Sequence, residues 1–317
     1  MDYRKAYGLP ERYFLSLGRM VEKKNLSTLV EAYARFARSS VEKHAAGSLE
    51  QGARTQGAHG LGRGANLTEH RDLSTEHCAP ALVFVGSGEL EGALREQARG
   101  LGLRVVDRTA AGSQSSGASR QEVNAENYKL NTEHSLENHG AAVFFYGFRQ
   151  IEENAIFYAL AEAFVLPSLK EEWGLVVNEA MACSLPVIVS CTAGCAEDLV
   201  PGGESWQCPV SVGLKQASLE YSAGSVQSGQ NVETENCRLK TGNSLEQRSN
   251  GFVFDPSSVE ALSEALKRIA DQKTKDPRDK ETSLLTEMGR RSREIVAKFS
   301  CENFARQALS AAKAALP

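Results

Sequence analysis

Four charged side chains have the types and the spacing to recognise a phosphorylated, hydroxyl-rich molecule. Arg19 and Lys24 follow a short apolar run and precede a helical pattern. Cations beside the free N–H groups of a helix N-terminus form a site for phosphate. Glu171 and Glu179 stand eight positions apart in another strand-to-helix segment, and ionised carboxylates accept hydrogen bonds from hydroxyl groups. We therefore expect these four side chains to face one crevice.

Each of these residues also has a simpler interpretation as a surface charge. Exposed Lys and Arg side chains are common, and the helix dipole favours Glu171 in a solvated first turn. Glu179 does not fit this interpretation, because its neighbours in the helix are apolar: Val176, Val177, Ala180, Met181 and Ala182. A carboxylate in so apolar a helix needs a partner or a ligand.

A glycine-rich turn raises an alternative ligand. Gly86, Gly88 and Gly92 form a G-x-G-x-x-x-G pattern after an apolar run. Such a turn is weak evidence for dinucleotide binding, which also requires an acidic residue about 20 positions later at the end of a second strand. That region is predicted to run into an insertion. We therefore interpret the glycines as a tight turn near a ligand, and an NAD-dependent oxidoreductase stays a minor alternative.

Strands and helices alternate along the chain, which predicts an α/β fold with a Rossmann-like parallel sheet and helices on both faces. The predicted strands are 13–17, 81–85, 143–146, 163–166, 186–190 and 251–254. The predicted helices begin at residues 26, 90, 151, 175, 259, 284 and 303, and Ser257 with Glu260 forms a candidate capping box for the fifth of them. Ligands of such sheets bind outside the carboxyl ends of the strands, so chemistry is expected in the turns that follow them.

Three long polar segments interrupt this pattern, at about 39–79, 107–139 and 204–249. They contain few large apolar residues and cannot bury enough surface to offset the entropy of ordering. We expect them to be disordered insertions in a single domain that covers residues 13–317.

Composition excludes several classes of partner. The net charge is −4, from 36 basic and 40 acidic residues, and no basic stripe is present, so we expect no nucleic-acid partner. The first residues contain no apolar signal segment, and the longest apolar runs are too short to span a membrane. The seven cysteines include no C-x-x-C pair, which argues against a structural metal site. We expect a cytoplasmic protein, either free or peripheral to a membrane.

Five motifs, in order, resemble those of glycosyltransferase family 4, whose members have the GT-B architecture of two Rossmann-like domains. The motifs lie at 18–26 (GRMVEKKNL), 82–89 (LVFVGSGE), 143–148 (VFFYGF), 167–179 (PSLKEEWGLVVNE) and 250–256 (NGFVFDP). The fourth matches the family's E-x7-E signature. The resemblance implies the C-terminal, donor-binding half of a GT-B fold.

The resemblance also implies roles for individual residues. Arg19 and Lys24 would hold the diphosphate of a UDP- or GDP-sugar and stabilise its charge as the glycosidic bond breaks. Glu171 would contact hydroxyls of the transferred hexosyl group, and Glu179 would contact the ribose. The nucleotide pocket would be lined by Gly86, Gly88, Gly147, Phe148 and Arg149. Family members retain anomeric configuration and need neither a metal nor another cofactor.

The chain departs from the family pattern in three ways. Residues 1–12 look like the linker to an acceptor-binding N-terminal domain that this sequence lacks. Ser184 replaces a glycine that usually precedes Leu-Pro, which implies a small backbone cost. The insertions are the third departure. The acceptor, a sugar or a lipid, stays undetermined, and so does an alternative in which the chain is a non-catalytic or split-enzyme subunit that pairs with a separate N-terminal half.

Overall fold

The computed structural model describes residues 2–55, 79–109, 141–201, 204–206, 249–271 and 284–315. Most of each predicted insertion therefore lies outside the described residues, at 56–78, 110–140 and 207–248. Their predicted disorder stays a prediction.

The described strands form one parallel sheet of eight strands in the order β3-β4-β2-β1-β5-β6-β8-β7. Their bounds are β1 Tyr13–Leu17, β2 Ala81–Val85, β3 Arg104–Asp107, β4 Ala142–Phe145, β5 Ala163–Leu166, β6 Val187–Ser190, β7 Glu204–Trp206 and β8 Gly251–Phe254. The predicted parallel α/β fold is confirmed. Sequence patterning missed β3 and β7, because both are short and carry charged residues that interrupt an apolar run: Arg104, Asp107 and Glu204.

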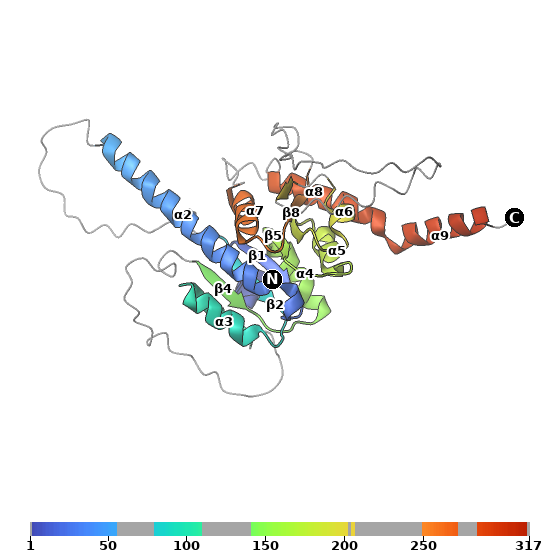
Figure 1. Cartoon of the computed structure of the whole chain (residues 1–317), viewed down its shortest axis with the longest axis horizontal. Coiled ribbons are helices and arrows are strands. Elements are labelled where there is room, and N and C mark those ends of the chain that lie inside the picture. The colour runs from blue at the N-terminus through green and yellow to red at the C-terminus, as the bar shows by residue number, and fades with distance from the viewer. Residues whose placement is uncertain are drawn as a thin grey trace, which may run out of the picture.

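Helices cover both faces of this sheet (Figure 1). One face packs against α2 (Leu26–Thr55), α3 (Glu91–Gly100) and α7 (Val259–Asp271). The other face packs against α4 (Ile151–Leu160), α5 (Leu175–Ala182) and the short α6 (Ala196–Leu199), and α8 (Leu284–Val296) lies against α5.

The central strands are mostly apolar because their side chains alternate between two cores. In β1, Phe14 belongs to the core under α2, whereas Tyr13 and Leu15 belong to the core under α4 and α5. All three are fully buried. The small Ser16 side chain of the same strand is buried with them.

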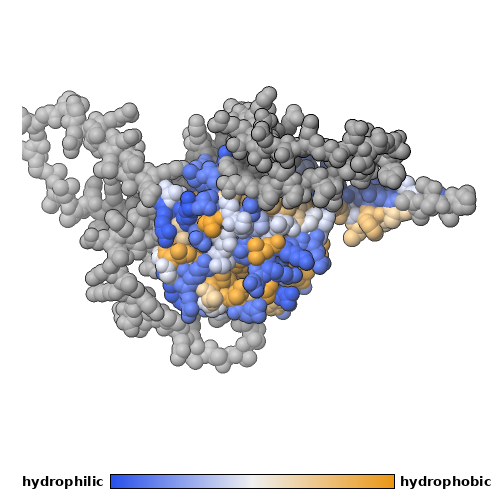
Figure 2. Space-filling view, viewed as in Figure 1, coloured by the Kyte–Doolittle hydropathy of each residue, from blue (hydrophilic) through white to orange (hydrophobic). Residues whose placement is uncertain are grey.

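Helical segments stand at both ends of the described chain, outside the sheet. The predicted linker, residues 1–12, contains α1 (Tyr3–Tyr7), which packs on α4: Tyr7 makes an edge-to-face contact with Phe157 and its hydroxyl donates to Glu153. Whether this segment joins another domain stays a prediction. At the other end, α9 (Cys301–Ala315) projects from the body (Figure 1), and its Phe304 is exposed. Figure 2 shows hydrophobic residues on the surface where this helix leaves the body.

Three local predictions differ from the structure. Helix α2 continues to Thr55, through the first part of the insertion expected at 39, because loss of an apolar stripe does not end a helix when the sequence contains good helix formers and no proline. Strand β7 lies within the third predicted insertion. The residue that caps α7 is Ser258, whose Oγ accepts from the N–H of Ala261 at 3.1 Å, while the Ser257 hydroxyl donates to Asp255.

The strand order creates one switch point. From β1 the chain moves to β2 and then to the edge pair β3 and β4, and it returns to place β5 on the opposite side of β1. The chain leaves β1 toward β2 and leaves β5 toward β6, in opposite directions across the sheet. A crevice therefore forms outside the carboxyl ends of β1 and β5. The turns that border it begin at Gly18 and at Pro167.

The backbone at Ser184 provides a stability test. Ser184 has φ of 61°, a left-handed conformation that costs an L-residue about 1–2 kcal/mol, as expected where the family has glycine. Ser184→Gly should raise the free energy of unfolding by about 0.5–1 kcal/mol in denaturant titrations, after the entropy of glycine in the unfolded chain is subtracted.

Asn25 is the matched control. It also has a positive φ, of 54°, but its side chain donates to the Pro256 carbonyl and accepts from the Thr28 hydroxyl, each at 2.8 Å. Asn25→Gly should therefore lower stability by about 1 kcal/mol. Equal effects of the two substitutions would contradict this explanation.

Candidate functional site

The turn after β1 brings two cations to the switch point. Gly18 (φ 142°) opens the turn, η1 (Glu22–Lys24) follows, and α2 starts after Asn25. The Arg19 side chain is exposed and has no hydrogen-bond or ion-pair partner within the described ranges. Lys24 is half-buried. One side of the crevice therefore carries a free guanidinium group and a partly desolvated amine.

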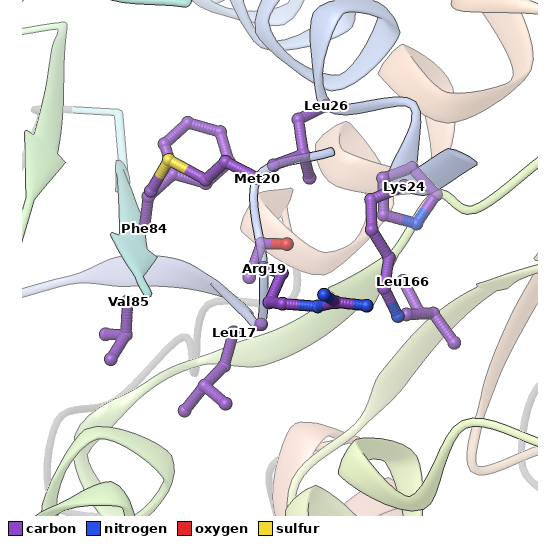
Figure 3. A pocket seen from close by; sticks show the side chains of 11 residues that line it. Leu17, Arg19, Met20, Lys24, Leu26, Phe84, Val85 and Leu166 are labelled. Atoms are coloured by element: carbon purple, nitrogen blue, oxygen red, sulfur yellow. The ribbon is translucent and has the colours of Figure 1, made fainter. Parts of the chain in front are cut away.

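Arg19 and Lys24 line a shared hollow at this point. In Figure 3 their charged ends extend toward each other. The hollow has a volume of about 10 Å³, enough for one water molecule. The backbone and apolar residues form its floor: Ser16, Leu17, Gly18, Met20, Leu26, Phe84, Val85, Leu166 and Pro167. A larger ligand would lie over this hollow, with its anionic part against the two cations.

The loop after β5 supplies the acid on the other side. The Lys24 amine pairs with the Glu171 carboxylate, and the Leu169 N–H donates to the Lys23 carbonyl at 2.9 Å. The Ser168 hydroxyl also donates to Glu171, at 3.3 Å. The convergence of Lys24 and Glu171 that the sequence predicted is therefore present, across the switch point.

The burial of this ion pair matters for its chemistry. The Lys24 and Glu171 side chains are 16% and 14% exposed, so water screens their attraction less than at a surface. A lysine amine has three N–H donors. Lys24 can thus keep its contact with Glu171 and still donate to an incoming anion. With Arg19 added, the crevice has one more positive than negative charge.

A network that sequence reasoning missed fixes the Glu171 loop. The fully buried Ser168 accepts, at its carbonyl, hydrogen bonds from the hydroxyls of Ser190 (2.6 Å) and Thr192 (2.9 Å). The Gly194 N–H donates to the Glu171 carbonyl at 2.9 Å. Hydroxyl residues just after an apolar strand were the available signal. The loop that carries Glu171 is thus held by the end of β6.

Glu179 has a different environment. It lies in the second turn of α5 and is not among the residues that line the hollow. Its Oε2 accepts from the hydroxyl of Tyr158 on α4 at 2.9 Å. The partner that we expected for a carboxylate in so apolar a helix is therefore the phenol of Tyr158. A further role of Glu179 at a ligand stays a prediction.

The glycines of the turn after β2 have a structural reason to be glycine. A Cβ on Gly86 would lie 2.0 Å from the Gly18 carbonyl oxygen, and one on Gly88 would lie 2.4 Å from the Met20 carbonyl oxygen. The Met20 N–H donates to the Ser87 carbonyl at 3.0 Å. The two turns are hydrogen-bonded backbone to backbone, which holds the Arg19 turn in place. Direct contact of these glycines with a ligand stays a prediction.

The turn after β4 presents one residue outward and one inward. The Gly147 carbonyl accepts from the Gly86 N–H at 2.7 Å. Phe148 is 67% exposed and is open to stacking on a flat ring. Arg149 is buried, and its Nη2 donates to the Arg108 carbonyl at 2.9 Å. The chain itself holds this guanidinium group, so its predicted place at a nucleotide stays a prediction.

Strand β3 changes the argument about dinucleotides. Asp107 ends this strand, about where a ribose-binding acid would stand after Gly86, in a region that we predicted to run into an insertion. However, β4 lies between β2 and β3, and the Asp107 carboxylate already accepts from Thr109 and pairs with Arg95. Those hydrogen bonds lower its pKa against the opposing effect of burial. An acid is therefore present, but β4 separates it from the glycine turn, and Thr109 and Arg95 already bind its carboxylate.

Metal and membrane features are absent from the described part of the chain. It contains no group of three or more His, Cys, Asp or Glu residues that could hold a metal ion. None of its helices combines the length and the apolar character needed to cross a membrane.

Comparison with known proteins gives a partial match. A family model described as glycosyl transferases group 1 matches residues 116–210, which is less than half of the chain. Within its described part, the matched segment contains β4 to β7 and both Glu171 and Glu179. No curated protein matches the sequence.

Several solved structures are similar to this chain. Anabaena HepE in complex with UDP is 15% identical, with a TM-score of 0.49, over 99% of this chain and 52% of that one. Sucrose-phosphate synthase from Thermosynechococcus elongatus is 20% identical, with a TM-score of 0.48, over 98% and 48%. WaaG, a glycosyltransferase involved in lipopolysaccharide biosynthesis, is 15% identical, with a TM-score of 0.43, over 93% and 45%. The chain spans about half the length of these proteins.

The glycine contacts lead to a testable contrast. Gly88→Ala must push the Met20 backbone away, so it should lower the free energy of unfolding by about 1–3 kcal/mol. Gly92 lies exposed in α3 with open space around its Cβ position, and Gly92→Ala should raise stability by about 0.5–1 kcal/mol. Denaturant titrations of both variants measure the difference. A Gly88→Ala variant as stable as the parent would show that the two turns are not locked together.

Proposed function

We propose that this chain is the donor-binding half of a retaining glycosyltransferase that takes a hexosyl group from a UDP- or GDP-sugar. The observation that carries the proposal is the meeting of Arg19, Lys24 and Glu171 at the crevice between the carboxyl ends of β1 and β5. The match of residues 116–210 to the glycosyltransferase model is a second, independent support, because Arg19 and Lys24 lie outside the matched segment and did not contribute to the match.

Arg19 and Lys24 would bind the diphosphate of the donor. A diphosphate carries several negative charges, and two converging cations offer charge-assisted hydrogen bonds to it. As the glycosidic bond breaks, negative charge grows on the leaving diphosphate, and cations already in place stabilise it without reorganisation. This arrangement would replace a metal ion, so we propose a metal-independent reaction.

Glu171 and Glu179 would recognise hydroxyl groups. Glu171 lies beside Lys24, so a sugar attached to a phosphate bound there would reach its carboxylate. Glu179 would accept from the ribose, and the exposed Phe148 would stack on the base. These roles follow from the resemblance and are compatible with the exposure of each residue.

Complete transfer would need a second half. Since the chain spans about half the length of the similar structures, we propose that an acceptor-binding domain, in the same or a separate polypeptide, closes over the crevice. Closure would exclude water and place the acceptor hydroxyl near the sugar. The acceptor, a sugar or a lipid, would be read by that half.

Calorimetry with UDP and GDP tests the proposal. The parent chain should bind at least one of them, and Lys24→Ala should weaken that binding about 10- to 100-fold, because a hydrogen bond to a charged group contributes about 1.5–3 kcal/mol.

Lys23→Ala is the matched control. Lys23 is the next residue in the same short helix, is exposed and does not line the hollow. This variant should bind within about twofold of the parent, since an exposed charge outside the hollow is screened by water and salt. Failure of a folded parent chain to bind either nucleotide, or equal losses in the two lysine variants, would overturn the proposal.

A further inference from the structure

Among the residues that the structure describes, Tyr158 is the hydrogen-bond donor to the Glu179 carboxylate. Its hydroxyl donates to Oε2 at 2.9 Å. Tyr158 is 2% exposed, and its ring packs edge-on against Phe164 at a centroid distance of 5.7 Å. The ring is therefore fixed by the core, and its hydroxyl points at one oxygen of a half-buried acid.

This contact differs from the ion pair at Glu171. Glu179 has no ion-pair partner among the residues that the structure describes, so a neutral donor holds a charged acceptor. Burial, followed by the nearby Glu179, raises the pKa of Tyr158 far above its ordinary value. The phenol thus stays protonated at physiological pH and donates its proton to Glu179.

We propose that Tyr158 is a positioning residue for nucleotide binding, one that occupies Glu179 Oε2 and leaves Oε1 to accept from hydroxyls of the ribose. A carboxylate on a flexible side chain loses rotamer freedom when it binds a ligand. A buried phenol that already fixes the carboxylate reduces that loss, which is the advantage of preorganisation. The inference rests on the proposed function, because it assigns a partner to the ribose-binding role of Glu179.

The experiment compares two ligands that differ only in the ribose. UDP carries both hydroxyls, and its 2′,3′-dideoxy analogue carries neither; the guanosine pair replaces them if the parent chain prefers GDP. Tyr158→Phe should weaken UDP binding about 5- to 20-fold, the loss expected when a charged hydrogen-bond acceptor is no longer held in place. The same variant should change binding of the dideoxy analogue less than about twofold.

Tyr33→Phe is the matched control. Tyr33 is also fully buried, and its hydroxyl donates to the Ala142 carbonyl in the opposite core. Removing that hydroxyl costs this hydrogen bond and the one that it accepts from the Ala142 N–H at 3.3 Å, without touching Glu179. Both ligands should therefore bind as they do to the parent.

The outcomes separate the two proposals. If the parent chain binds neither nucleotide, the proposed function fails. If it binds UDP and Tyr158→Phe weakens both ligands equally or neither, the proposed function stands and the role of Tyr158 is overturned. A Glu179→Gln variant combined with Tyr158→Phe should lose no more UDP affinity than the larger single effect, because the two residues act through one contact.

If the Tyr158→Phe variant does not fold, a second measurement on the parent chain tests the inference. In the parent chain labelled with ¹³Cζ-tyrosine, the Tyr158 signal reports on the hydrogen bond of its phenol. We expect this signal to move when UDP is added and to stay in place with the dideoxy analogue. A signal that responds equally to both ligands, or to neither, would contradict the inference.

Discussion

The pairing of Lys24 with Glu171 joins the two halves of the sheet at the point where its strand order reverses. The amine comes from the turn after β1 and the carboxylate from the loop after β5. Both side chains are largely shielded from water, and removing one partner of such a pair leaves an uncompensated charge. This constraint fixes the spacing of the two loops, and it leaves Arg19 as an exposed cation of the crevice with no ion-pair partner among the described residues.

The rest of the structure supports this arrangement by rigid backbone contacts. On one side, the close approach of Gly86 and Gly88 to the β1 turn holds Arg19. On the other, the hydroxyls of Ser190 and Thr192 bond the Ser168 carbonyl and fix the loop that carries Glu171. A site built in this way is preorganised, so a bound anion would meet donors that need little rearrangement.

Sequence patterning predicted much of this fold, for a physical reason. Strands buried on both faces must be largely apolar, and strands 13–17, 81–85, 163–166 and 251–254 have the predicted bounds. The strand-end rule then located the crevice and the meeting of Lys24 with Glu171. Strand order did not follow from patterning, because nothing local to β3 shows that β4 lies between it and β2.

Contacts between segments far apart in the sequence could not be predicted either. The partner of Glu179 lies 21 positions away on another helix, and an apolar helix gives no sign of which residue will meet the acid. The glycines of the β2 turn were interpreted as a tight turn near a ligand, and nothing in the sequence indicated that backbone atoms of the β1 turn lie against Gly86 and Gly88. To explain why a turn contains glycine, one must know which loop packs against it, and the sequence of the motif does not show this.

The most direct test of the account is a crystal structure of this chain with UDP-glucose. The account predicts that the diphosphate lies within hydrogen-bond distance of Arg19 and Lys24, and that a glucose hydroxyl donates to Glu171. A nucleotide bound at the edge of the sheet near Asp107, or one whose phosphates avoid both cations, would contradict it.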